Sequence, residues 1–159
     1  MVGGEYLSRH PKHHNFRGRG SLVCVKCKGY CVHGGFAVQS HSTFQDLRVW
    51  QGAMDLAEKV YRATFEFPKH ELYGLTSQMR RAAVSVPSNI AEGKGHRSDP
   101  EFVRFLFHAR GSLLELQTQV LIAKRLQYLS EEKAEELVRC GNGIGRGLNA
   151  LINRFRSAA

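Results

Sequence analysis

The chain has 159 residues, 42% of them apolar, and carries a net charge of +9. This length suits one domain of ordinary size with a buried core. No run of about 18 apolar residues occurs that would span a membrane. The first 20 residues hold four Lys/Arg and no apolar stretch, which argues against a secretory signal. We therefore expect a soluble, cytoplasmic protein.

Residues 1–43 differ in composition from the rest of the chain. They contain six Lys/Arg, one acid, seven glycines and five of the eight histidines, without sustained hydrophobic periodicity. We expect a basic, disordered extension. Within it, Cys24, Cys27, Cys31 and His33 are residue types that bind zinc. The Cys31-x-His33 spacing is tighter than common zinc sites use, so a metal site and an incidental cysteine-rich tail remain alternatives.

A first helix is predicted from about residue 44 to Phe67. Its apolar residues recur at alternating steps of three and four, as on one face of a helix. Ser42 precedes Gln45 at capping-box spacing, and Pro68 ends the helix because proline disfavours helical geometry at the preceding residue. Two apolar stripes lie side by side, one with Leu47, Trp50, Met54, Ala57 and Tyr61, the other with Val49, Ala53, Leu56, Val60, Ala63 and Phe67.

A second helix is predicted over residues 76–92. Pro87 lies inside it and conflicts with the carbonyl of Ala83, so a kink is expected. Gly93 and Gly95 then allow the chain to turn. The inward face is formed by Leu75, Met79, Ala82, Ala83, Val86 and Ile90.

A third helix is predicted after Ser98, which begins a capping box with Glu101. Like the first helix, this helix has two apolar stripes, which together cover a wider arc than a bundle helix needs to bury. The core stripe holds Phe102, Phe105, Ala109, Leu113, Leu116, Val120 and Ala123, and a second stripe holds Val103, Phe107, Leu114 and Leu121.

A fourth helix is predicted after Ser130, with Glu131 and Glu132 at its positively polarised start. Glycine occupies alternate positions from Gly141 to Gly147, and each interior glycine costs about 1 kcal/mol relative to alanine. The helix either frays there or packs closely against a neighbour. Its apolar positions are Leu137, Ile144, Leu148, Leu151 and Phe155.

Long helices with short connections predict an all-α domain over residues 44–159. We expect an antiparallel up-down four-helix bundle with a kinked second helix. The wide apolar arcs exceed what one bundle needs to bury, so self-association through helix faces is expected. The alternative is that long helices in one bundle simply bury more of their circumference.

The sequence offers no defensible set of catalytic or cofactor-binding residues. Di-iron bundles need Glu-x-x-His pairs, and none occurs; Walker, Gly-x-Ser-x-Gly and His-Glu-x-x-His motifs are also missing. Glu92 and Glu115 can face each other, either for acid–base work or, as we favour, as polar groups around the kink. We expect no enzyme activity and no cofactor.

Basic residues on the second helix and around the following turn are candidates for phosphate binding. Any nucleic-acid contact is expected to be with the backbone and to weaken with salt, because no base-reading module is present. A solvated surface paired with nearby acids is the alternative. The candidate nucleic-acid-binding residues are Arg80, Arg81, Lys94, Arg97 and Arg104, with His96 beside them.

Several sequence blocks resemble one protein family. The first is Phe-Gln-Asp-Leu-Arg-Val-Trp-Gln at 44–51, and the most specific, at 73–93, ends in Ser-Val-Pro-Ser-Asn-Ile-Ala-Glu-Gly. Glu-Phe-Val-Arg-Phe at 101–105 and Gly-Ser-Leu-Leu-Glu-Leu at 111–116 continue the match. The blocks resemble the four-helix-bundle proteins found in intervening sequences of bacterial 23S rRNA genes. The resemblance covers about residues 44–155.

The resemblance implies an all-α bundle that assembles as a ring, typically a homopentamer, with no established enzyme activity. It also implies kinship with accessory proteins of diversity-generating retroelements, which are basic and associate with nucleic acid and a reverse transcriptase. We therefore expect a non-catalytic homo-oligomer that binds RNA or DNA backbone. A protein-interaction scaffold without nucleic-acid binding is the alternative.

Three features depart from the family pattern. Residues 1–43 precede the usual start. Gln127 replaces a glycine that usually stands before Tyr-Leu in the third connection, and the glycines at 141–147 are unusual.

Overall fold

The structure is a computed structural model that describes residues 43–157. Four long helices make up the domain, and three short 3-10 helices flank the first of them. No strand occurs in residues 43–157, so the all-α prediction is confirmed. The elements are η1 (Phe44–Asp46), α1 (Arg48–Ala63), η2 (Thr64–Glu66), η3 (Lys69–Glu71), α2 (Leu75–Gly95), α3 (Asp99–Arg125) and α4 (Glu131–Arg156).

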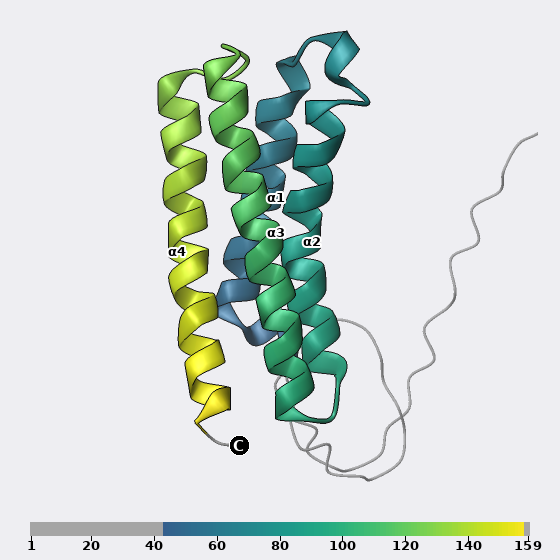
Figure 1. Cartoon of the computed structure of the whole chain (residues 1–159), viewed down its shortest axis with the longest axis vertical. Coiled ribbons are helices and arrows are strands. Elements are labelled where there is room, and N and C mark those ends of the chain that lie inside the picture. Colours follow the sequence, from purple (N-terminus) through teal and green to yellow (C-terminus); the bar gives the residue numbers. More distant parts are fainter. Residues whose placement is uncertain (1–42, 158–159) are drawn as a thin grey trace, which may run out of the picture. The chain divides into compact units, whose positions relative to one another are not determined.

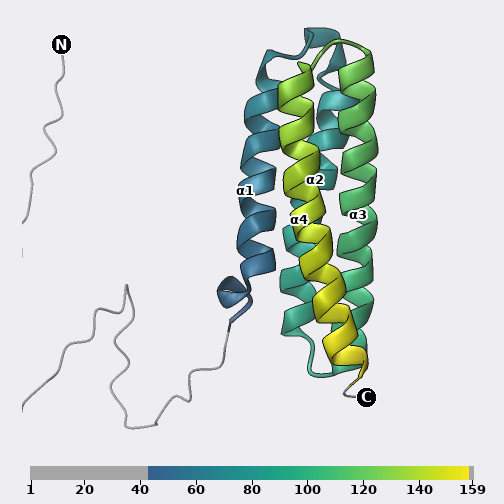
Figure 2. The ribbon, with the colours of Figure 1, turned by 90° about the vertical axis from the view of Figure 1, so that its left-hand side faces the viewer.

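The four helices pack as a bundle in which each contacts two neighbours. Helix α1 packs against α2 and α4, and α3 packs against the same two helices. Successive helices run in opposite directions (Figures 1 and 2). One end carries the α2–α3 turn and the last turn of α4, while the other carries η2, η3 and the α3–α4 connection (Figure 1). None of the described helices combines the length and apolar character that crossing a membrane requires.

The core is one continuous cluster of apolar side chains contributed by all four helices. Each large member of the cluster, such as a Val, Leu, Ile, Met or Phe, contributes about 1.5–3 kcal/mol when it leaves water. The inward face predicted for α2 is confirmed, except that Leu75 is only half-buried. The members with no exposed surface include Val60, Met79, Val86, Ile90, Leu106 and Leu148.

Helix α1 is shorter at both ends than predicted. The backbone N–H of Thr43 donates to Asp46 Oδ2 (2.7 Å) in the η1 turn, and the predicted cap Ser42 lies outside the described residues. Leu47 is extended, with ψ of 114°, and separates η1 from α1. At the other end Phe67 is also extended, with ψ of 151°, as the proline that follows it requires.

The α2–α3 turn is tighter than predicted. Helix α2 continues through the buried Pro87 to Gly95, and the kink stays a prediction. The expectation that Gly93 belongs to the turn is wrong, because Gly93 is buried in the last turns of α2. A Cβ added there would lie 2.6 Å from Phe105 Cβ, so close helix packing requires glycine. Ser98 caps α3 as predicted by accepting a hydrogen bond from the Glu101 N–H (3.4 Å).

The predicted core stripe of α3 is wrong at one position. Leu106 is fully buried, whereas Phe105 is only half-buried. Three of the four residues in the second predicted stripe of this helix remain exposed, with 39% of Phe107, 56% of Leu114 and 50% of Leu121 accessible. The fourth, Val103, is partly buried against the core. A single bundle therefore leaves apolar side chains of this helix exposed to solvent, as the wide apolar arc in the sequence predicted.

Helix α4 is continuous through its alternating glycines. A Cβ at Gly141 would lie 2.9 Å from Gln117 Nε2 of α3, and one at Gly147 would lie 3.1 Å from Val49 Cγ2 of α1. Close packing against a neighbour, one of the two expected alternatives, therefore accounts for Gly147. At Gly141 the nearest atom is the end of a flexible glutamine side chain, which can move aside.

Candidate nucleic-acid interface

The five predicted basic residues separate into two groups. Arg80 and Arg81 lie near the start of α2, whereas Lys94 lies in its last turn. Lys94 follows Arg81 by 13 positions, which corresponds to about 20 Å of helix. Arg97 in the turn and Arg104 on α3 lie at the same end as Lys94. The structure brings three of the five candidates together and leaves two apart.

Arg80 is engaged inside the fold. Its Nε donates to Thr64 Oγ1 (2.9 Å), its Nη2 donates to the Thr64 carbonyl (3.4 Å), and its guanidinium lies 4.9 Å from the centre of the Tyr61 ring. The buried Thr64 hydroxyl in turn donates to the Val60 carbonyl (2.9 Å). These contacts join the end of α1 to α2, so Arg80 is better explained as a structural residue than as a phosphate ligand.

Arg81 is paired with polar groups on its own helix, α2, and on α3. Its Nη2 donates to Gln78 Oε1 (2.9 Å) and lies 3.8 Å from Glu115. Glu92 lies near the other end of α2, next to the glycine that packs on Phe105. The structure therefore does not bring Glu92 and Glu115 together as an acid–base pair.

A small polar cluster lies between α2 and α3 near Pro87. Ser112 Oγ donates to Ser85 Oγ (3.0 Å), and Asn89 Nδ2 donates to the Ser85 carbonyl (2.7 Å) and hydroxyl (3.0 Å). Each of these groups has a partner, which is the ordinary way to accommodate polar side chains at a helix interface. The cluster supports the structural interpretation over a catalytic one.

The end of the bundle with the α2–α3 turn also receives two arginines from α4 that the sequence reasoning missed. Phe155 on α4 meets Phe102 on α3 edge-to-face at 5.1 Å. Lys94 lies 5.8 Å from the Phe102 ring and Arg154 lies 5.7 Å from the Phe155 ring. We call the five residues Lys94, Arg97, Arg104, Arg154 and Arg156 the basic end. A sequence signal for the α4 contribution exists, because residues 137–157 hold four arginines and no acid.

The bundle is electrically polarised along its length. The half that contains the basic end, residues 43–52, 86–112 and 145–157, holds eight Lys/Arg and four acids. The opposite half, residues 53–85 and 113–144, holds nine of each. The whole excess of positive charge in the described domain therefore lies in one half, where it can attract an anionic partner.

Ion pairing sharpens this difference. At the basic end Arg104 pairs with Glu101 (3.1 Å), while Lys94, Arg97, Arg154 and Arg156 have no ion-pair partner within residues 43–157. In the opposite half, five of the nine Lys/Arg, on α1, α2, α3 and α4, are paired with acids. Four of the five cations of the basic end are therefore free of ion pairs within residues 43–157 and available to phosphates.

One of these pairs joins α1 to α4. A hydrogen bond from Lys59 to Glu136 raises the pKa of Lys59 above its ordinary value and lowers the pKa of Glu136 below its own. Both groups stay charged at neutral pH and neutralise each other, which fits a structural contact.

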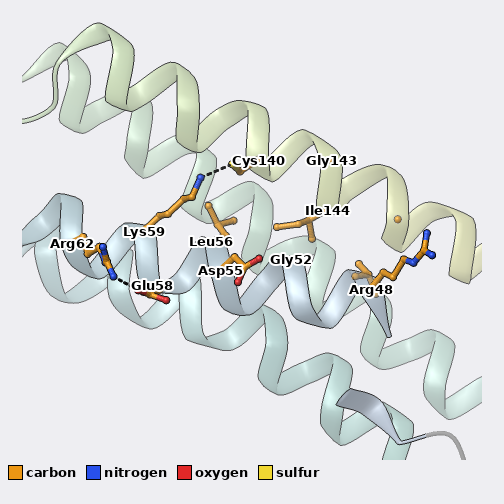
Figure 3. A pocket seen from close by; sticks show the side chains of 12 residues that line it. Arg48, Gly52, Asp55, Leu56, Glu58, Lys59, Arg62, Cys140, Gly143 and Ile144 are labelled. Carbon is orange, nitrogen blue, oxygen red and sulfur yellow. Dashed lines mark hydrogen bonds and ion pairs between the residues drawn. The ribbon is translucent and has the colours of Figure 1, made fainter. Parts of the chain in front are cut away.

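A groove of about 620 Å³ lies between α1 and α4 (Figure 3). Gly52 and Gly143 line it from the two helices, and Lys59 Nζ lies 3.6 Å from Cys140 Sγ at its wall. Its cations are Arg48, Lys59 and Arg62, and its acids are Asp55 and Glu58. With both signs of charge in the groove, it is a weaker candidate for a polyanion than the basic end.

Two apolar surfaces lie elsewhere on the bundle. The α1–α2 groove, of about 520 Å³, is lined by Trp50, Met54, Tyr61, Val84 and Pro87 among others. Met54 and Tyr61 are 45% and 46% exposed. The α3 stripe consists of Phe107, Leu114 and Leu121, which follow one another at intervals of seven residues and so lie on one face of the helix. The two surfaces differ, since one is a groove between two helices and the other is a row of exposed side chains on one helix.

The described part of the chain contains no cluster of three His, Cys, Asp or Glu side chains that could hold a metal ion. The zinc candidates Cys24, Cys27, Cys31 and His33 lie outside that part, so their role stays a prediction.

Comparison with known proteins agrees with this fold. A crystal structure of a protein of unknown function from the S23 ribosomal protein family of Bacteroides thetaiotaomicron superposes with a TM-score of 0.60. It is 20% identical, and the match covers 65% of this chain and 97% of that one. No curated protein matches the chain. The model of the 23S rRNA-intervening sequence protein family matches residues 45–150, and the chain belongs to that family.

Proposed function

We propose that this protein is a non-catalytic homo-oligomer that binds the phosphate backbone of RNA or DNA through its basic end. The observation that carries the proposal is the polarity of the bundle, with four of the five basic-end cations unpaired within residues 43–157. Phosphate contacts from Lys and Arg supply most of the affinity of proteins that bind nucleic acid without reading its sequence.

Self-association is the second part of the proposal. The α1–α2 groove and the α3 stripe both leave large apolar side chains in water, which is typical of interaction surfaces. Because the two surfaces differ, docking one on the other joins copies head to tail, and such an interface closes into a ring when the rotation permits. A ring, for which the family resemblance suggests five copies, repeats the basic end in every copy and so increases avidity.

The accessory proteins of retroelements that the chain resembles associate with a reverse transcriptase. We extend the proposal to such an enzyme as a protein partner.

The experiment is a salt titration of binding to a labelled single-stranded RNA, read by fluorescence anisotropy. We expect binding at low salt that weakens as salt rises. The double variant Arg97→Ala/Arg154→Ala should weaken binding and flatten the log–log salt dependence by about one unit for each cation that contacts a phosphate. The matched control is Lys69→Ala/Arg125→Ala, which removes the same charge from the opposite end.

Absence of binding at low salt, a flat salt dependence, or equal effects of the two double variants would contradict the proposal. A protein-interaction scaffold is the second candidate, because the exposed apolar surfaces can also receive another protein. It predicts a partner that remains bound after nuclease treatment and no affinity for free RNA.

A further inference from the structure

An exposed pair of stacked rings lies at the basic end. The imidazole of His96, in the α2–α3 turn, lies nearly parallel to the Phe105 ring, with centroids 4.9 Å apart and an angle of 18° between planes. His96 is exposed and Phe105 is half-buried. Among residues 43–157 the His96 ring pairs with no other aromatic ring and with no acid, and the residue is exposed to solvent.

The fold holds this pair in place. Phe105 packs on Gly93 of α2, where the missing side chain lets the Phe105 Cβ approach to 2.6 Å from the site of a Cβ. Helix α3 begins at the Ser98 cap, two residues after His96, so the turn that carries the imidazole is short. Because close packing already fixes the positions of the two rings, a flat ligand can bind to them without rearrangement of the protein.

Basic side chains lie near the pair. The Arg104 guanidinium lies 5.4 Å from the centre of the Phe105 ring, and the His108 ring lies 5.9 Å from it. Arg97 directly follows His96 and is exposed. Aromatic faces between positive groups form the arrangement that binds single-stranded nucleic acids, because bases stack on the rings while cations follow the backbone.

We propose that His96 and Phe105 form a stacking platform for an unpaired nucleobase of a single-stranded nucleic acid whose phosphates lie on the basic end. The inference rests on the proposed function and adds to it a preference for single strands over duplexes, because the base faces of a duplex are stacked on one another and inaccessible. It gives a role to an apolar ring that was predicted to lie in the core and is only half-buried beside a histidine.

The experiment compares four labelled ligands at low salt: a short single-stranded RNA, the single-stranded DNA of equal length, an abasic strand of equal charge, and a duplex. The full-length protein should bind both base-bearing single strands more tightly than the abasic strand. His96→Ala should weaken binding of the base-bearing strands about tenfold, as expected for the loss of one base stack, and leave the abasic strand unaffected.

Two further variants separate stacking from charge and from misfolding. His96→Phe keeps a ring without the imidazole and should restore most of the affinity. His70→Ala removes an exposed histidine from the opposite end and should change nothing. Circular dichroism of each variant confirms that the bundle is intact.

Equal binding of base-bearing and abasic strands, or loss of affinity for both in His96→Ala, would overturn the platform but leave backbone binding standing. A preference for the duplex would overturn it as well. Failure of all four ligands to bind at low salt would instead overturn the proposed function, so the two failures are distinguishable.

Discussion

Gln127 adopts a φ of 61° where α3 ends, a backbone conformation that disfavours side chains with a Cβ. Its N–H donates to the Lys124 carbonyl (2.9 Å), and the N–H of Tyr128 donates to the Ala123 carbonyl (2.9 Å). This is the Schellman arrangement, in which glycine is the usual residue at the left-handed position. The geometry gives a physical reason to expect glycine at this position.

We therefore predict that Gln127→Gly raises the free energy of unfolding by about 0.5–1 kcal/mol. The gain from relieving the left-handed strain is partly offset by the greater freedom of glycine in the unfolded chain. Urea denaturation followed by circular dichroism, at one fixed protein concentration, measures the change. Gln127→Ala is the control, because alanine keeps the Cβ. An equal gain in both variants would mean that the side chain, and not the backbone, causes the effect.

At the scale of a helix, two glycines in helix interiors have opposite effects on stability. Among residues 43–157, a Cβ at Gly143 of α4 would meet only Arg146 Nη2, at 3.9 Å, whereas one at Gly93 of α2 would meet Phe105 Cβ at 2.6 Å and Phe102 Cδ2 at 3.0 Å. Gly143 therefore weakens its helix without a packing benefit. Gly93 allows α2 and α3 to approach, and through Phe105 it also positions the ring beneath His96.

We predict that Gly143→Ala stabilises the protein by about 1 kcal/mol and that Gly93→Ala destabilises it by about 2 kcal/mol. The first value is the intrinsic preference of a helix for alanine, and the second is the cost of overpacking a tight contact. Thermal and urea unfolding of the two variants, compared with the parent at equal concentration, test the signs. A stabilised Gly93→Ala protein would show that the helices separate easily, and the close packing argued here would be wrong.

Local signals predicted much of this fold, because helix caps act within a few residues. Ser98 and Ser130 accept hydrogen bonds from backbone N–H groups three residues later, as their spacing indicated. The errors at Gly93 and Phe105 have one cause. Whether a glycine ends a helix or admits a neighbour, and whether a ring faces the core, depends on how α2 and α3 approach each other, which periodicity within one helix does not specify.

In the candidate site, too, the sequence predicted what is local in the chain and missed what depends on tertiary packing. Lys94, Arg97 and Arg104 are close in the chain, so the sequence placed them together. Arg154 and Arg156 reach the same end only because α4 returns along the bundle (Figure 1). Arg80 looked equivalent in sequence, but its guanidinium is bonded to Thr64, a tertiary contact that the sequence did not reveal.

For the whole molecule, the two apolar surfaces make the assembly testable. Leu114 is 56% exposed on the α3 stripe, so Leu114→Glu should leave the bundle folded but place a charge in the proposed interface. We expect light scattering coupled to size exclusion to report a monomer, because a buried, unpaired carboxylate costs an interface several kcal/mol. Leu72→Glu, at a residue 50% exposed and outside both surfaces, is the matched control and should retain the parent mass.

A second variant decides how the copies are joined. Met54→Glu damages the α1–α2 groove and should also give a monomer. If the groove of one copy receives the α3 stripe of the next, a mixture of the two variants contains one intact groove and one intact stripe. The mixture should then form a dimer that grows no further, because its remaining surfaces are both damaged. A mixture that stays monomeric would show that the groove and the stripe do not pair with each other, and the head-to-tail arrangement would have to be abandoned.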